Sequence, residues 1–319
     1  MDRLAALRVF ARVVELGSFT RAADALELSR ARTSEAIQAL EQSLGARLLH
    51  RTTRRVSLTD DGRAYYERVR RILDDVTEAD ASVTSARKTA RGKLRVDIPV
   101  ALGRLFVLPQ LPELFRRHPE LELELRLENR SIDLAREGVD CAISLGTPHD
   151  EQLVARRIAT THLLTCASPA YLARRGEPTT PEQLEHHDCI AFLNLSTARP
   201  TAWEFRRRGA RVSHAPRGNL AINSMEACVD AAAAGLGVTQ VLSSLSYTAI
   251  RAGRLRPLLV EVAAPGPSLF AVYPPNLQAS ARLRVFVDFV AELFSRLDAH
   301  HEELVQSARA PRKRRQRKR

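Results

Sequence analysis

The sequence has no apolar run long enough to cross a bilayer. A membrane-spanning helix needs about 20 predominantly apolar residues, and Arg3, Arg8 and Arg12 interrupt the first apolar residues, so no secretory signal peptide is indicated. Hydrophobic residues make up 45% and charged residues 27% of the 319 positions, which is an ordinary globular composition. We therefore expect a cytoplasmic protein of two or three domains without a membrane partner.

Cysteine is scarce, and its spacing argues against the common cysteine-based sites. The four cysteines are far apart and form no Cys-x-x-Cys pair: Cys141, Cys166, Cys189 and Cys228. Buried, reduced thiols are therefore the main prediction. His186 and His187 stand close to Cys189, but no second ligand cluster lies nearby in the sequence, so a zinc site there is the minor alternative.

Catalytic signatures are missing as well. The chain contains no G-x-S-x-G motif, no P-loop and no G-x-G-x-x-G fingerprint. His162, His186 and His214 are isolated in the sequence, and isolated histidines are more often structural than catalytic. We predict no catalytic residues, no cofactor and no metal, and hence a protein that is not an enzyme.

Acidic residues are absent from the last eleven positions, which carry eight Lys or Arg. Residues 1–91 have a net charge of +4, and residues 92–308 hold 24 basic and 24 acidic residues. The excess charge is thus confined to the two ends of the chain, which implies a polyanionic partner there and another role for the middle. We expect residues 309–319 to be a disordered basic tail, because no apolar residue follows Pro311.

The first 45 residues have the pattern of a helix-turn-helix. Apolar residues follow helical spacing over residues 2–16, Gly17 ends that helix, and Ser18 can cap a second helix that contains closely packing alanines. Ser29 can cap a third helix, which Gly45 stops. A short helix, a tight turn and another helix form the helix-turn-helix arrangement.

The third helix separates a buried stripe from a polar face. Thr33, Ile37, Leu40 and Leu44 make the stripe, and the opposite face carries Ala31, Ser34, Glu35, Gln38 and Gln42. Small residues allow a helix to enter the major groove of DNA, where amide and carboxylate groups read base edges. Arg30 and Arg32 flank this face, where phosphates would run. The alternative is a solvated face in which Glu35 pairs with Arg32.

A basic hairpin is expected directly after the third helix. Leu48-Leu49 and residues 56–58 resemble two short strands that enclose Arg51, Arg54 and Arg55. Such a hairpin would be a wing whose arginines contact phosphates, which gives affinity for DNA without sequence choice.

A long helix should follow Thr59. Its apolar residues recur in steps of four and three, which is a heptad pattern: Tyr65, Val69, Ile72, Val76, Ala79 and Val83. We predict that Tyr65, Val69, Ile72 and Val76 hold a homodimer, which would suit a reader of two DNA half-sites. The alternative is a helix that packs only on its own domain.

These residues resemble the LysR-type transcriptional regulators. The similarity is carried over residues 2–62 by GSFTRAADAL, the pair Ser29 and Ser34, IQALEQSLGARLL, Arg51 and VSLTDDG. Arg30 and Ala31 stand where the family commonly has Gln and Pro, and Glu35 stands where a basic residue is common. The resemblance therefore supports placement in the groove but transfers no base preference.

The neutral middle alternates strands and helices. Strands are expected at 94–99, 121–127, 139–144, 163–168, 189–194, 210–215, 237–242 and 268–274, with helices at 105–117, 132–137, 225–234 and 283–297. Such alternation indicates α/β layers with a parallel sheet. This order, with GKLRVDIPVALGRLFVLPQLPELF and CASPAYL, resembles the two-lobed α/β, periplasmic-binding-protein-like effector domain of the LysR family.

The expected organisation is α+β and multidomain. Residues 1–59 form the winged helix-turn-helix domain, residues 60–89 the linker and dimerisation helix, and residues 92–308 the effector-binding domain. Lobe I covers about 92–161 and 267–300, and lobe II about 162–266. Ligands in such folds bind at the carboxyl ends of strands, which here present Val100, Ala101, Ser144, Gly146, Asn194, Asn223 and Ser224. Val100 and Ala101 are apolar where the family often has Ser or Thr.

We therefore predict a sequence-specific regulator of transcription that binds double-stranded DNA as a homodimer or homotetramer and responds to a small-molecule effector. One alternative is a cytosolic solute-binding module whose N-terminus serves only assembly. Another is a nucleoid-type protein that binds DNA without sequence choice through its charged ends.

Overall fold

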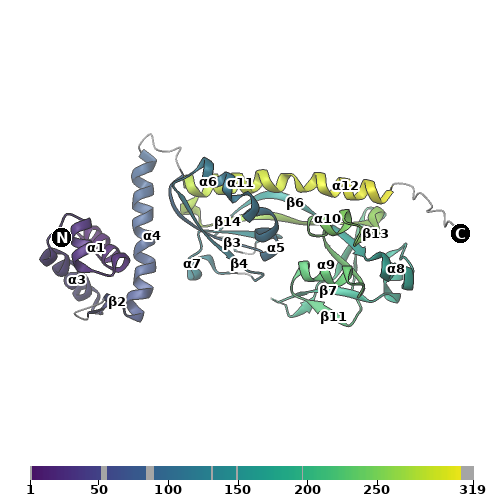
Figure 1. The fold of residues 1–319 in the computed structure, drawn as a ribbon, viewed down its shortest axis with the longest axis horizontal. Helices are drawn as coiled ribbons and strands as arrows, with labels where there is room; N and C mark the ends of the chain where they lie inside the picture. Colours follow the sequence, from purple (N-terminus) through teal and green to yellow (C-terminus); the bar gives the residue numbers. More distant parts are fainter. Residues whose placement is uncertain are drawn as a thin grey trace. The chain divides into compact units, whose positions relative to one another are not determined.

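The structure is a computed structural model that describes residues 2–51, 56–83, 90–130, 132–148, 150–195 and 197–309. The chain divides into two compact units, Met1–Gly92 and Lys93–Arg319. Figure 1 labels many of their helices and strands. Among the described residues, no helix is both long and apolar enough to traverse a membrane.

The N-terminal unit is a winged helix-turn-helix followed by a long helix. Its elements are α1 (Arg3–Leu16), α2 (Phe19–Ala25), α3 (Arg30–Leu44), β1 (Leu49–Arg51), β2 (Val56–Leu58) and α4 (Asp60–Val83). The expected caps are present: Gly17 and Gly45 end α1 and α3 in the left-handed conformation, and the Ser18 and Ser29 side chains accept backbone N–H groups.

The junction between the wing and α4 is held by a close backbone contact. Thr59 Oγ1 accepts the N–H of Gly62 at 2.9 Å and donates to the carbonyl of Arg47 at 2.7 Å. A Cβ atom on Gly62 would lie 1.9 Å from the carbonyl oxygen of Leu48. Only glycine therefore allows α4 to begin this close to β1.

The second unit contains one mixed sheet and a separate hairpin. The strands are β3 (Gly92–Ile98), β4 (Leu121–Leu127), β5 (Cys141–Leu145), β6 (Val154–Ala167), β7 (Cys189–Asn194), β8 (Arg199–Pro200), β9 (Trp203–Arg207), β10 (Ala210–His214), β11 (Leu220–Ile222), β12 (Val238–Leu242), β13 (Arg256–Leu258) and β14 (Pro265–Tyr273). The order in the sheet is β11-β7-β12-β6-β14-β5-β3-β4, with β13 beside β6 and β8 beside β7.

The sheet is parallel only in parts, which corrects the expectation of a parallel sheet. The pairs β3 with β5, β7 with β11 and β7 with β12 are parallel, whereas β6 and β14 run antiparallel to their neighbours. Strand β6 pairs with β14 up to His162 and with β12 from Leu163, so it passes from lobe I into lobe II. The long strand β6 can be followed across this unit in Figure 1.

The helices of this unit cover the sheet. They are α5 (Val100–Leu102), a π-helical turn (Gly103–Val107), a 3-10 turn (Leu108–Gln110), α6 (Leu111–Arg117), α7 (Leu134–Glu137), α8 (Pro169–Arg175), α9 (Met225–Ala233), α10 (Ser243–Arg251), α11 (Ala281–Ser295) and α12 (Leu297–Arg309), with 3-10 turns at Pro181–His186, Val260–Val262 and Pro275–Leu277. The helical segment expected from Leu105 thus begins at Val100. In Figure 1, α11 and α12 run end to end along one side of the unit.

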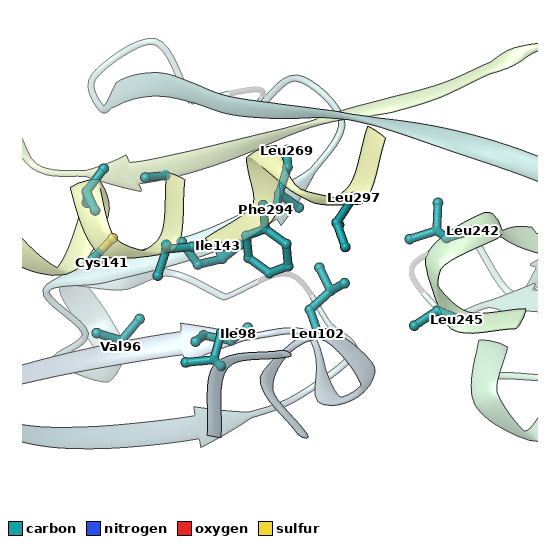
Figure 2. Close-up of a cluster of buried hydrophobic side chains, with 14 of the residues drawn as sticks. Val96, Ile98, Leu102, Cys141, Ile143, Leu242, Leu245, Leu269, Phe294 and Leu297 are labelled. Carbon is teal, nitrogen blue, oxygen red and sulfur yellow. The ribbon is translucent and has the colours of Figure 1, made fainter. Parts of the chain in front are cut away.

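One hydrophobic core extends through both lobes. The strict alternation of residues 121–127 turns the leucines of β4 toward this core, next to the buried residues of β3. Figure 2 shows Phe294 among side chains such as Leu102 and Ile143, with Leu242 and Leu245 of lobe II beside them. The core therefore ties α11 to the sheet and the two lobes to each other.

One residue of the expected tail, Arg309, is part of a helix. Arg309 is the last residue of α12, and its guanidinium forms a two-contact ion pair with Glu261, with distances of 2.8 and 2.9 Å. It therefore belongs to the folded unit, because an acidic partner distant in sequence holds it. The remaining tail, residues 310–319, lies outside the described residues.

Candidate nucleic-acid interface and ligand site

Local capping fixes where α3 begins and which face it buries. Ser29 Oγ accepts the N–H of Arg32 at 3.2 Å, and Thr33 Oγ1 donates to the Ser29 carbonyl at 3.1 Å. The stripe buried against the core of the unit consists of Thr33, Ala36, Ile37 and Leu40. Helical geometry then directs the remaining side chains away from the core.

The six residues expected to meet DNA on α3 lie on this opposite side: Arg30, Ala31, Arg32, Ser34, Glu35 and Gln38. Ser34 is half-buried, and the other five are exposed. Arg32 and Glu35 form no ion pair with each other, and neither Arg30 nor Arg32 pairs with another described residue. The alternative, an ion pair between Glu35 and Arg32, is therefore not found. The guanidinium groups of Arg30 and Arg32 are available to contact DNA phosphates.

A carboxylate that the sequence reasoning missed holds the wing against α3. Glu41 Oε1 accepts the N–H of Leu48 at 2.8 Å and of Leu49 at 3.1 Å. Strand β1 pairs antiparallel with β2, with Arg51 opposite Val56. Arg51 thus lies in the wing, and Arg54 and Arg55 fall outside the described residues. In the sequence, Glu41 could have been recognised as an acidic residue on the half-buried side of an amphipathic helix.

Part of the apolar seam of α4 packs into the core of its own N-terminal unit. Val69 has no exposed surface and lies in the core of the N-terminal unit, and the Tyr65 ring packs 5.8 Å from that of Phe10. Assigning Val69 to a dimer contact was therefore wrong, because a side chain with no exposed surface cannot meet a partner. Ile72 is 45% exposed and Val76 is half-buried, so these two remain available.

In lobe I, the predicted ligand residues lie near the carboxyl-terminal ends of β3 and β5. Val96 of β3 is paired with Cys141 of β5 in a parallel register, which places Val100, Ala101 and Gly146 directly after the two carboxyl ends and Ser144 in the last part of β5. Val100 and Ala101 belong to the first helical turn, not to a loop. The helical turn begins at Val100 because a residue distant in sequence caps it: Asn129 Oδ1 accepts the N–H of Val100 at 3.1 Å.

In lobe II, the predicted residues form a second group. The parallel pairing of Ile222 with Phe192 places Asn194 and Asn223 at the same edge of β7 and β11. Ser224 caps α9, and its Oγ accepts the N–H of Ala227 at 3.3 Å. Ser144 of lobe I and Asn194, Asn223 and Ser224 of lobe II thus place polar side chains at or next to strand ends of both lobes.

An ion pair that the sequence reasoning missed joins these two groups. Arg104 lies one turn after Val100, and its Nε donates to Glu226 Oε1 at 3.1 Å, from lobe I to lobe II. The Glu226 side chain is 14% exposed and that of Arg104 is 62% exposed. The hydrogen bond to Glu226 raises the pKa of Arg104. In the sequence, the signal was a pair of opposite charges near the starts of two helical segments that follow strand ends.

The cysteines and histidines have structural surroundings. All four cysteines are buried free thiols, as predicted, and burial raises the pKa of Cys166 to about 12 and of Cys189 to about 11. Cys189 Sγ donates to the Leu184 carbonyl at 3.7 Å, and Tyr171 Oη lies 3.2 Å from His187 Nδ1. Among the described residues, no group of three or more His, Cys, Asp or Glu side chains could hold a metal ion.

Comparison with known proteins agrees with this architecture. Residues 4–63 match the family model of the bacterial regulatory helix-turn-helix protein of the lysR family, and residues 87–295 match that of the LysR substrate binding domain. An uncharacterised helix-turn-helix-type transcriptional regulator of Escherichia coli K12, YhjC, is 37% identical over 291 residues, covering 91% of this chain and 97% of that protein.

Two solved structures are similar to this chain over most of its length. The LysR-type transcriptional regulator CrgA from Neisseria meningitidis is 31% identical with a TM-score of 0.58, over 90% of this chain and 97% of that chain. The full-length Vibrio cholerae virulence activator AphB is 26% identical with a TM-score of 0.56, over 92% and 100% of the two chains. This chain therefore belongs to the LysR family and is a DNA-binding transcriptional regulator that responds to a small molecule, in a family whose members act as oligomers.

Proposed function

We propose that α3 enters the major groove and that Ser34, Glu35 and Gln38 read base edges while Arg30 and Arg32 contact phosphates. The proposal rests on the exposed polar face of α3, whose flanking arginines have no ion-pair partner among the described residues. Ala31 provides the small surface that allows close approach to the bases. Arg51, Arg54 and Arg55 of the wing supply further phosphate contacts.

We also propose that the effector binds where the strand ends of the two lobes come together. The Arg104–Glu226 ion pair supports this location, because it links the helical segment that follows β3 to the first turn of α9. A ligand there would bias the relative position of the lobes. Regulation would then follow from a population shift between assemblies that space or bend their DNA sites differently.

Three further parts of the proposal concern the whole chain. It acts without catalysis, in the cytoplasm and on the nucleoid, where its DNA target lies. The described part of α4 offers Ile72 and Val76 for self-association, since both retain exposed surface. Domain boundaries near residues 59 and 90 separate DNA reading from effector sensing, in keeping with the division of the chain at Gly92.

A footprint on the intergenic DNA beside the gene tests sequence-specific reading. A discrete protected site, sharpened or shifted by an effector, is the expected result. Uniform coverage would instead indicate a nucleoid-type protein, and absence of protection would indicate a solute-binding module whose N-terminus serves only assembly.

Gln38 provides the residue-level test of this proposal. Gln38→Ala should weaken binding to the protected site by about 1–3 kcal/mol and leave binding to scrambled DNA nearly unchanged, because an amide reads a base edge and carries no charge. Titration of both duplexes by fluorescence anisotropy measures the difference. Gln152→Ala removes an exposed amide from the other unit and is the control that should change neither affinity. An equal loss on both duplexes for Gln38→Ala would contradict the assignment.

A further inference from the structure

Lobe II, which lies outside the DNA-binding unit, contains an arginine-rich hairpin. Strands β9 and β10 pair antiparallel and form a two-stranded sheet of their own, which we call the arginine hairpin, residues 203–214. Four of the six positions from 206 to 211 are arginine, and all four are exposed: Arg206, Arg207, Arg208 and Arg211. Neither the reading of DNA by α3 nor effector binding uses these residues.

The hairpin is firmly anchored at its base. Trp203 is 2% exposed and Phe205 is 1% exposed, and both lie in a buried cluster with Tyr171 of α8. Alternation along β9 turns Glu204 and Arg206 to the opposite, outward face. The arginines therefore stand on a rigid support, so that less side-chain and backbone entropy is lost when a ligand binds.

Two features of the hairpin are unfavourable for the isolated chain. Arg206 lies directly opposite Arg211 in the ladder, and like charges in cross-strand pairs are destabilising. Arg208 occupies the two-residue turn at a φ of 50°, a position where Asn or Gly is preferred over a long side chain. A sequence that breaks two local rules within six residues suggests selection for function at that point.

The charge of the hairpin is only partly neutralised. Arg207 Nη1 pairs with Glu182 at 2.8 Å, and Arg211 Nε lies 3.7 Å from Glu204. Arg206 and Arg208 form no ion pair with any residue that the structure describes. Their guanidinium groups are thus available to an external anion, in the fork geometry that suits phosphate oxygens.

The hairpin also meets the basic end of the chain. Phe205 forms a bridge with Ala263, Arg211 Nη2 donates to the carbonyl of Pro265 at 3.1 Å, and Arg309 at the end of α12 pairs with Glu261. Residues 261–265 therefore hold together two basic segments that are about a hundred residues apart in sequence. Seven more Lys or Arg follow Arg309 in the sequence.

We propose that the arginine hairpin is a second, sequence-independent contact for duplex DNA, made to the phosphate backbone. This inference rests on the DNA binding of the family, since a duplex held by the N-terminal unit is present at high effective concentration for any other basic surface of the same chain. Within the hairpin, Val212 is the one large apolar residue that is exposed. The hairpin surface therefore lacks the apolar face with which a protein inserts into a membrane.

Two variants of the full-length chain test the proposal. Arg206→Ala/Arg208→Asn removes both unpaired charges and also relieves the cross-strand repulsion and the turn strain, so the variant should fold. Arg136→Ala/Arg284→Ala removes two exposed arginines from lobe I and matches the change in net charge. The probes are random-sequence duplexes of about 25 base pairs, enough for two half-sites one helical turn apart, and about 80 base pairs.

Affinity is measured against salt concentration for each protein and duplex. On the long duplex, the hairpin variant should lose about one to two units of the slope of log K against log salt and bind about tenfold more weakly near 0.1 M salt. On the short duplex, the hairpin variant should have the same salt slope as the unchanged protein. The lobe I control should have the slope of the unchanged protein on both duplexes. Arg206→Lys/Arg208→Lys should retain most of the slope, because phosphate neutralisation depends on charge.

Each contrary outcome is distinct. If the hairpin variant keeps the full slope on the long duplex, or the lobe I control loses as much, the hairpin does not contact DNA. If the hairpin variant keeps its DNA slope but loses binding to vesicles that contain phosphatidylserine, the partner is a membrane surface, and the proposal is overturned. If the unchanged protein binds neither duplex, the proposed DNA binding of the whole chain is wrong, and this outcome is distinguishable from a failure of the hairpin proposal alone.

Discussion

Asp97 is the next-to-last residue of β3 and lies on the face of the strand opposite the buried residues Val96 and Ile98. It is 4% exposed, and its Oδ2 accepts no hydrogen bond from any residue that the structure describes. Burial, and next the nearby Glu128 carboxylate, raises the pKa of Asp97 to about 6, although Arg130 opposes the shift. An ionised carboxylate at this position therefore destabilises the folded effector domain.

The sign of the resulting pH dependence follows from linkage. Between about pH 4 and pH 6 the folded chain holds a proton at Asp97 that the unfolded chain has released, so this group makes stability fall as pH rises through that window. Asp97→Asn should abolish this contribution and raise the free energy of unfolding at pH 7.5 relative to pH 4 by up to about 2–3 kcal/mol.

Chemical denaturation at the two pH values, followed by fluorescence of Trp203, measures this difference, because the single tryptophan of the chain is buried in the same unit. Asp230→Asn, at an exposed carboxylate on α9, is the control and should behave as the unchanged protein. A stability difference between Asp97→Asn and the unchanged protein that is the same at pH 4 and pH 7.5 would refute the shifted pKa.

At the scale of elements, the parts set by neighbouring residues were predictable. Ser29 and Gly45 bound α3 as expected, since a serine cap and a left-handed glycine act within one turn. The start of the helix at Val100 was not predictable, because its cap comes from Asn129 in another segment. For the same reason, the Arg104–Glu226 pair, 122 residues apart, could be found only once the lobes were folded.

The start of α4 gives a prediction about packing. Gly62→Ala should destabilise the N-terminal unit by about 1–3 kcal/mol, although alanine normally favours a helix interior, because its Cβ would overlap the carbonyl of Leu48. Thermal unfolding by circular dichroism, together with loss of DNA binding, measures the effect. Arg63→Ala changes the next, exposed residue and should be neutral or slightly stabilising. Equal melting curves for the two variants would show that α4 starts farther from the wing.

The exposed part of the α4 seam gives a prediction about assembly. Ile72→Asp should weaken self-association without unfolding the chain, because a charge would enter an apolar contact while the domain core stays intact. Val69→Asp is the contrasting variant and should unfold the N-terminal unit, since it places a charge in that core. Light scattering and circular dichroism separate the two effects. An unchanged oligomer of Ile72→Asp would show that this face of α4 is not an interface.

At the scale of the whole molecule, the net charge of a segment does not show how its charged residues are distributed. Residues 92–308 are neutral in sum, yet four arginines gather within positions 206–211 of that segment. The N-terminal unit and the chain end carry the excess, and the end of α12 is anchored beside the arginine hairpin through Glu261. Four exposed arginines of the effector unit therefore lie close to the start of the basic chain end, while we assign the choice of DNA sequence to α3.

The final prediction concerns residues 310–319, which carry seven of the 49 basic residues. Removing them should weaken binding to all duplexes and lower the salt slope by several units, at most about six, because each phosphate contact contributes about 0.9. The truncation should start at Ala310, because Arg309 is paired with Glu261 and its loss would also disturb α12. The ranking of DNA sites and the footprint of the N-terminal unit should not change, since α3 is untouched. A tail of the same length with every Arg replaced by Lys should keep the slope. Equal slopes for the truncated and full-length chains on one duplex would mean that the tail only solubilises the protein and never reaches DNA.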